Sequence, residues 1–199
     1  MTQVSSADAE YAKGNSRGGR DMHRYPLIQR ALHWIIAVMV IGSMLVGGTL
    51  GYLGFQGAVE VFGQPMTGMM YKYHKTFGVI ILAAMVVRLI VKVRLGKPDY
   101  AAPLTKFEKA ASGSVHGLLY LLLIAMPVTG WLATGAGGFP VEFFDWKLPP
   151  ILGKDPALAE TLFYAHWLMG LAILALIAVH IAAVVKHVKR KDGVLQRML

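Results

Sequence analysis

Cysteine is absent from this 199-residue chain. Without thiols the protein can form no disulfide, no cysteine-ligated iron–sulfur cluster and no covalent haem link through a Cys-x-x-Cys-His motif. Charge is also scarce, because only 16% of the residues are Asp, Glu, Lys or Arg, whereas 55% are hydrophobic and the mean hydropathy is +0.51. This composition argues against a soluble domain and indicates a membrane protein.

Acidic residues are the scarcer of the two charge types, with 11 Asp and Glu against 20 Lys and Arg, and the formal net charge is +9. A basic excess can indicate nucleic-acid binding. Here, however, the basic residues flank hydrophobic runs and do not form a separate face, which is typical of the positive-inside rule for membrane proteins. We therefore expect the lipid bilayer as a partner and no nucleic acid.

Four hydrophobic runs are long enough to cross the roughly 30 Å hydrocarbon core as helices. The second is interrupted by Lys72, Lys75 and Arg88, whose charged ends must reach towards the membrane surfaces. Pro127 predicts a kink in the third. The sequence predicts an all-α membrane protein, a four-transmembrane-helix up-down-up-down bundle, with helices at about 33–53, 70–93, 113–134 and 161–185.

The segments outside these runs predict the domain organisation and the topology. Residues 1–21 are rich in Ser, Gly and charge and predict a flexible cytoplasmic tail, so residues 22–199 form a single domain. Lys and Arg gather in that tail, between helices 2 and 3, and after helix 4, which places both termini in the cytoplasm. The glycine-rich segment 54–65 and the loop 135–160 then lie outside.

Histidines inside the hydrophobic runs are the strongest functional signal, because ionisable groups at this depth are costly. His166 and His180 are fourteen residues apart, so they share a helix face and lie about 21 Å apart along the axis. One ion cannot touch both, and each needs a partner at its own depth. The predicted topology places His74 at the outer level with His166, and His33 at the inner level with His180.

Two facing imidazoles suit only some metal centres. Zinc takes three or four protein ligands, whereas a haem macrocycle leaves two axial positions to fill. Gly78 and Gly170 follow the outer histidines by four residues and would leave room for a flat ring, although helix contact explains such glycines equally well. The pattern predicts two haems between the helices.

Three other residues lie near the inner level. His116 has the same predicted depth as His33 and competes with it on spacing alone, and a hydrogen-bonded structural histidine is an equally good interpretation. Arg88 follows His74 by fourteen residues and is a candidate to bind a haem propionate, or simply reaches towards the surface. His187 lies seven residues beyond His180, at the rim of the inner site.

At the outer end, Lys72 and Lys75 flank His74. They could concentrate positive potential and steer an anion to this site, while anchoring to lipid headgroups is the commoner role of such lysines. The loop 139–150 offers a docking surface for another protein. No acidic residue inside the helices suggests a proton relay, so proton pumping is disfavoured.

Several segments together resemble the bacterial cytochrome b561 family of four-helix, di-haem inner-membrane cytochromes. They are QRALHW at 29–34, YKYHKTFG at 71–78, MVVRL at 85–89, HGLLYLLLIAMPVTGW at 116–131, GFPV at 138–141 and DGVLQRM at 192–198, with the spacing of His166 and His180. The resemblance implies His33 with His180 on one haem b and His74 with His166 on the other. It also implies a quinone, such as ubiquinone, near His187.

The resemblance implies electron transfer across the bacterial inner membrane between a quinone and a periplasmic donor or acceptor. Some members that the chain resembles oxidise superoxide while reducing ubiquinone, so a superoxide:ubiquinone oxidoreductase is one expectation. A haem-bearing anchor subunit for a periplasmic dehydrogenase or other redox protein is the alternative. A histidine-based metal or proton transporter is a third hypothesis, from a different class.

Overall fold

The computed structural model describes residues 24–98 and 103–199. The predicted tail, residues 1–21, lies outside the described part of the chain. Four long helices dominate the structure: α2 (Leu27–Phe62), α3 (Gln64–Leu95), α4 (Lys106–Ala136) and α5 (Pro156–Arg190). All four are long and apolar enough to cross a membrane, so the prediction of four transmembrane helices is confirmed.

Local sequence signals explain where the helices begin and end. Thr105 caps α4, because its hydroxyl accepts a hydrogen bond from the Glu108 amide while the Glu108 carboxylate accepts one from the Thr105 amide. Asp155 caps α5, with Pro156 in the first turn. Gly63 and Gly96, both at positive φ, end α2 and α3. Each helix extends beyond its hydrophobic run, because these caps lie outside it.

The first outer connection differs from the expected glycine-rich loop. Helix α2 (Leu27–Phe62) consists of two helical segments that meet at a kink, where Gly54, with φ of 66° and ψ of −178°, leaves the helical conformation. A residue without a Cβ adopts this backbone geometry without strain, so Gly54 ends the first helical segment and a second, short one follows it directly. Gly63 alone then joins α2 to α3. Helix α4, in contrast, runs uninterrupted through Pro127.

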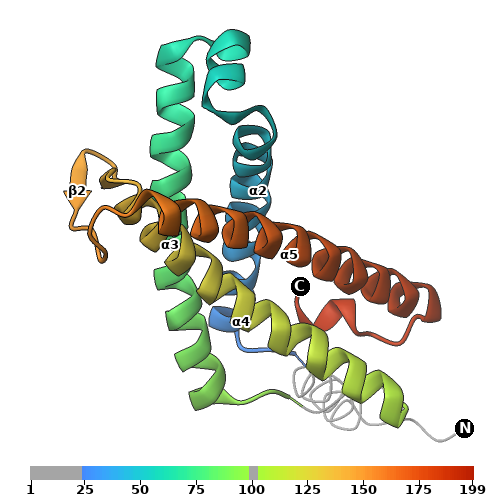
Figure 1. Ribbon diagram of the computed structural model, residues 1–199. Helices are drawn as coiled ribbons and strands as arrows, with labels where there is room; N and C mark the ends of the chain where they lie inside the picture. The colour runs from blue at the N-terminus through green and yellow to red at the C-terminus, as the bar shows by residue number, and fades with distance from the viewer. Residues whose placement is uncertain (1–23, 99–102) are drawn as a thin grey trace, which may run out of the picture.

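The helices form two antiparallel hairpins, α2 with α3 and α4 with α5, which cross one another (Figure 1). Helices α3 and α4 make most of the contact between the hairpins, and α2 and α5 touch over a short stretch. The small buried core at the crossing contains Ile36, Val40, Ile81 and Met85. Large apolar side chains cover the outer faces of the helices, as a bilayer requires.

A short β-hairpin in the second outer connection was not foreseen from the sequence. Strands β1 (Val141–Phe143) and β2 (Trp146–Leu148) pair antiparallel, and β1 packs on α3. The hydroxyl of Thr76, which is fully buried, accepts from the Phe144 amide at 3.0 Å, and its single proton is shared between the Lys72 carbonyl at 3.0 Å and the Glu142 carbonyl at 3.2 Å. This hairpin is therefore fixed to the helical turn that follows His74.

The C-terminal segment folds back across the inner end of the bundle. After α5, a 3-10 turn, η1 (Leu195–Arg197), brings the chain to the start of α2, where the Trp34 indole donates to the Met198 carbonyl at 2.8 Å. Arg197 donates to the Pro98 carbonyl at 2.7 Å, beyond the end of α3. These bonds tie the end of α5 to both helices of the other hairpin.

Candidate functional site

Each of the four long helices carries a pair of residues fourteen positions apart, which puts both on one helix face. The pairs are His33 and Gly47, His74 and Arg88, His116 and Gly130, and His166 and His180. The structure brings these positions together at two levels. The outer level contains Gly47, His74, Gly130 and His166, and the inner level contains His33, Arg88, His116 and His180. The two-level arrangement expected from the histidines is therefore present in the fold.

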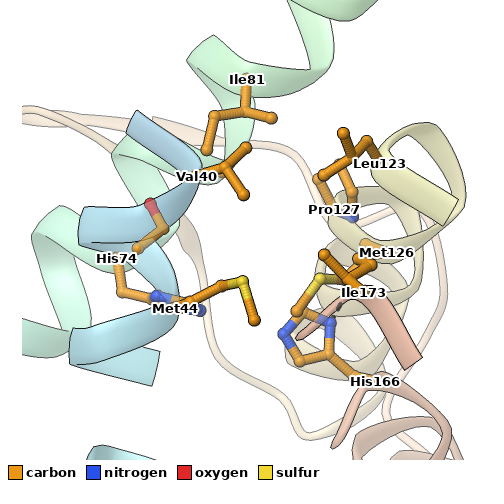
Figure 2. Close-up of a pocket in the computed structure, with 11 residues that line it drawn as sticks. Val40, Met44, His74, Ile81, Leu123, Met126, Pro127, His166 and Ile173 are labelled. Atoms are coloured by element: carbon orange, nitrogen blue, oxygen red, sulfur yellow. Dashed lines mark hydrogen bonds between the residues drawn. The ribbon is translucent and has the colours of Figure 1, made fainter. Parts of the chain in front are cut away.

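At the outer level, the rings of His74 and His166 face each other from α3 and α5. Their centroids lie 6.1 Å apart with an interplanar angle of 88°. Figure 2 shows them on opposite sides of a pocket, with the thioether of Met44 reaching into the gap. Apart from the two imidazoles and Ser43, the pocket has an apolar lining of Val40, Met44, Gly78, Ile81, Leu123, Met126, Pro127 and Ile173.

Hydrogen bonding orients one of these rings. Nδ1 of His166 lies 3.0 Å from the Met126 carbonyl, which can only accept, so Nδ1 carries the proton. Nε2 then keeps its lone pair. This is the usual arrangement of a histidine that coordinates a metal, whose second ring nitrogen donates to a carbonyl or carboxylate.

Two glycines that the sequence analysis did not single out lie against the outer histidines, in addition to Gly78 and Gly170, which were expected to leave room for a flat ring. Gly47 and Gly130 lie directly against the His74 and His166 rings. Gly78 lines the pocket, and a Cβ there would meet nothing within 4 Å, while a Cβ on Gly170 would meet only the Met126 methyl, at 3.5 Å. Fourteen-residue spacing from His33 and His116 was the signal that could have identified Gly47 and Gly130.

At the inner level, His180 has two imidazole neighbours. Its ring centroid lies 6.3 Å from that of His33 and 5.1 Å from that of His116. Nδ1 of His116 lies 2.6 Å from the Ser112 carbonyl and so donates to it. The geometry therefore does not decide whether His33 or His116 pairs with His180, and the spacing in the sequence did not decide it either.

Arg88 reaches this level from α3. Its Nη2 lies 3.2 Å from Nδ1 of His33, and its Nε donates to the Tyr120 hydroxyl at 2.9 Å. The third guanidinium nitrogen, Nη1, is buried without a hydrogen-bond partner, and Lys92 lies 4.0 Å above the Tyr120 ring centroid. Two cations and an unsatisfied donor form a setting that favours a carboxylate, as haem propionates supply. Tyr120 had not been singled out from the sequence.

His187 lies near the C-terminal end of α5 and pairs with Asp192, which follows the helix. Both side chains are mostly buried, with 13% and 14% of their surfaces exposed. Burial acts to raise the pKa of Asp192, but hydrogen bonds from His187 and the Val194 amide outweigh it and hold the pKa below its ordinary value. The pair fixes the His187 ring through Nδ1 and leaves Nε2 for another partner.

Lys72 and Lys75 do not stand alone beside His74. Lys72 forms an ion pair with Asp145 at 2.6 Å, and Lys75 pairs with Glu142, both on the β-hairpin. The sequence analysis predicted a concentrated positive potential because it assumed that these two lysines have no carboxylate partners. Each positive charge is matched by a negative one, so the potential at this surface is weaker than the sequence indicated.

The residues present fit a haem held by two imidazoles. The outer rings face each other across an apolar pocket, and one has its second nitrogen bonded to a carbonyl. Within residues 24–98 and 103–199, no group of three or more His, Cys, Asp or Glu side chains is placed to hold a bare metal ion. Fold and site thus define a class, a helical membrane protein with intramembrane histidines placed to ligate haem.

Comparison with known families agrees with this class. The family described as prokaryotic cytochrome b561 matches residues 24–199, and the chain belongs to this family. It is a multi-pass membrane protein, and its family implies a b-type haem and electron transfer across the membrane. The resemblance stated from the sequence motifs and the predicted four-helix fold are confirmed.

Individual relatives align over most of their lengths. The chain is 28% identical to cytochrome b561 homolog 2 of Escherichia coli (strain K12), over 88% of this chain and 91% of that protein. It is 27% identical to the probable superoxide oxidase CybB of Yersinia pestis, covering 89% and 97%. It is 30% identical to cytochrome b562 of Cereibacter sphaeroides, covering 88% and 94%.

Proposed function

We propose that this protein carries electrons across the bacterial inner membrane through two non-covalent haem b groups, one at each level of the helix bundle. The observation that supports this most directly is the presence of facing imidazoles at two levels, on helices that share the same fourteen-residue spacing. A haem supplies one-electron redox chemistry, and the protein supplies its ligands and its surroundings.

His74 and His166 are proposed as the axial ligands at the outer level, and His33 and His180 at the inner level. The outer assignment rests on the apolar pocket between the two rings. The inner assignment rests on the family resemblance, because the His116 ring lies nearer to that of His180, at 5.1 Å, than the His33 ring does, at 6.3 Å. Arg88 is proposed to bind an inner propionate, which would satisfy its partnerless Nη1.

Ubiquinone or another quinone is the proposed partner at the inner end, beside His187. Asp192 holds Nδ1 of this ring, so Nε2 is the atom that would hydrogen-bond a quinone carbonyl. With both termini cytoplasmic, as the distribution of Lys and Arg predicts, this site faces the cytoplasm.

The proposed partner at the outer end is superoxide or a periplasmic redox protein. The Yersinia relative is named a probable superoxide oxidase, which favours superoxide. A second candidate function, a haem-bearing anchor for a periplasmic dehydrogenase or other redox protein, is favoured by the exposed apolar side chains of the β-hairpin region. Phe139, Phe144 and Trp146 are 63%, 49% and 73% exposed.

The central test is the haem count of purified protein, by reduced-minus-oxidised spectra and a pyridine haemochrome assay. We expect two haems per chain in the wild type and one in each of His74→Ala and His166→Ala, with the inner haem spectrum retained. A wild-type protein with one haem, or outer variants that keep two, would overturn the proposal. Copurification of a periplasmic protein in stoichiometric amount would favour the anchor function.

A further inference from the structure

The ring of each outer histidine is seated against a glycine on the preceding helix. A Cβ added to Gly47 of α2 would lie 2.5 Å from Cε1 of His74, and one added to Gly130 of α4 would lie 3.0 Å from Cε1 of His166. Carbon atoms in favourable contact lie about 3.5–4.0 Å apart. Each imidazole therefore occupies space that a side chain at the glycine position would need.

This close approach is specific to one face of each helix. Gly47 follows His33 by fourteen residues, and Gly130 follows His116 by fourteen, so each glycine lies on the face that presents a histidine at the inner level. Crowding is not common to all glycines of these helices, since a Cβ on Gly48 of α2 or on Gly117 of α4 would meet nothing within 4 Å. Gly51 of α2 is also crowded, but by the Trp167 ring, which a Cβ there would approach to 2.7 Å.

The two contacts differ in severity. Real Cβ atoms essentially never come as close to a neighbour as the 2.5 Å found at Gly47, so a methyl there requires the His74 ring to move. At Gly130 the 3.0 Å contact requires the His166 ring to yield by a few tenths of an ångström only. The ring of His166 is also held by its hydrogen bond to the Met126 carbonyl.

We propose that Gly47 and Gly130 are positioning residues that set the orientation of the two outer imidazole rings. The proposal rests on the proposed function, because those rings are taken there as axial ligands of the outer haem. The relative orientation of two axial imidazole planes affects the electronic structure of a ferric haem, and ligand geometry affects its reduction potential. A methyl group on either helix face would thus alter a haem that it does not ligate.

The experiment compares Gly47→Ala and Gly130→Ala with the matched controls Gly48→Ala and Gly117→Ala in purified holoprotein. Three quantities are measured: haem content, the reduction potentials of both haems, and the low-temperature EPR g values of the ferric outer haem. We expect Gly47→Ala to change the outer g values and potential most, or to lose the outer haem. Gly130→Ala should show a smaller change, and the controls should match the wild type.

Retention of the inner haem in each variant shows that the bundle has folded. Unchanged outer g values and potential in Gly47→Ala, or equal changes in Gly47→Ala and Gly48→Ala, would overturn the proposal. If Gly47→Ala does not accumulate, the comparison of Gly130→Ala with Gly117→Ala decides it by the same criteria. Failure of the proposed function is detected by a separate measurement. If His74→Ala and His166→Ala both keep as many haems as the wild type, these histidines are not the outer ligands.

Discussion

The guanidinium of Arg88 lies 3.2 Å from Nδ1 of His33. Because a guanidinium only donates hydrogen bonds, Nδ1 of His33 accepts, and the ring proton is on Nε2 in this arrangement. His166 shows the opposite tautomer, with its proton on Nδ1. Ligation through Nε2 of His33 would require Arg88 to bond another acceptor, which a propionate provides.

Replacing Arg88 should therefore affect the inner haem alone. In Arg88→Leu the loss of a nearby positive charge disfavours the reduced, more negative haem, and we expect its potential to fall by roughly 60 mV, a tenfold change for one electron. A potentiometric titration with both haems resolved measures this. Arg88→Lys keeps the charge and is the matched control, with a smaller fall expected. Equal potentials in Arg88→Leu and the wild type would place the guanidinium away from the inner haem.

The inner ligand pair can be assigned by separate alanine variants. We expect His180→Ala and His33→Ala each to lose the inner haem and to retain the outer one, because both are proposed axial ligands. We expect His116→Ala to retain two haems, because the family resemblance pairs His33, not His116, with His180. Haem content per chain is the measurement. Two haems in His33→Ala together with one in His116→Ala would assign the site to His116 and His180.

The quinone end is tested at His187 and Asp192. In His187→Ala the loss of one hydrogen bond, of about 1 kcal/mol, should slow electron exchange with a soluble quinone analogue severalfold without changing haem content. Asp192→Asn keeps a side chain that can bond Nδ1 and removes the charge, so a smaller effect is expected. Stopped-flow oxidation of the reduced protein by the analogue gives both rates. Identical rates in His187→Ala and the wild type would exclude this residue from the quinone site.

The ion pairs of the β-hairpin lead to a prediction about anion capture. Because Asp145 and Glu142 neutralise Lys72 and Lys75, the double variant Asp145→Asn, Glu142→Gln should leave both lysines uncompensated. We expect faster haem reduction by superoxide in this variant at low ionic strength, with the gain lost once the Debye length falls below about 10 Å. A Lys72→Gln, Lys75→Gln variant is the control and should be slower. If the rates of both variants do not change with salt, electrostatic steering does not contribute to the capture of superoxide.

The same pairing has a defined pH range. The hydrogen bond from Lys72, with the attraction of its charge, lowers the pKa of Asp145 below its ordinary value of 3.8. A lowered folded-state pKa stabilises the fold above the unfolded-state pKa, and the contribution disappears as pH falls through the folded-state value. We therefore expect Asp145 to remain ionised and paired with Lys72 at both pH 7 and pH 5, which an NMR titration of the Asp145 carboxyl measures; protonation of this carboxyl within that range would contradict the prediction.

The sequence by itself determined the four membrane helices and the two histidine levels. Helical periodicity and the length of an apolar run are local properties, so the spacing of His166 and His180 fixed a shared face and a separation before any fold was known. The family resemblance added the proposal that His33 pairs with His180 at the inner level. Capping residues such as Asp155 and Gly63 are local signals as well. The helices extend beyond the apolar runs as far as these capping residues.

Only the tertiary structure decided which groups from different helices meet. The contacts of Gly47 with His74 and of Gly130 with His166 depend on how the two helices of each hairpin pack. The bond from Arg88 to Tyr120 and the pairing of Lys72 with Asp145 depend on how the α3 helix meets the second half of the chain. The β-hairpin was missed because its strands have three residues each and are held by bonds to Thr76 on α3, not by their own pattern. Periodicity places a residue at a depth and on a face, but packing chooses its neighbour.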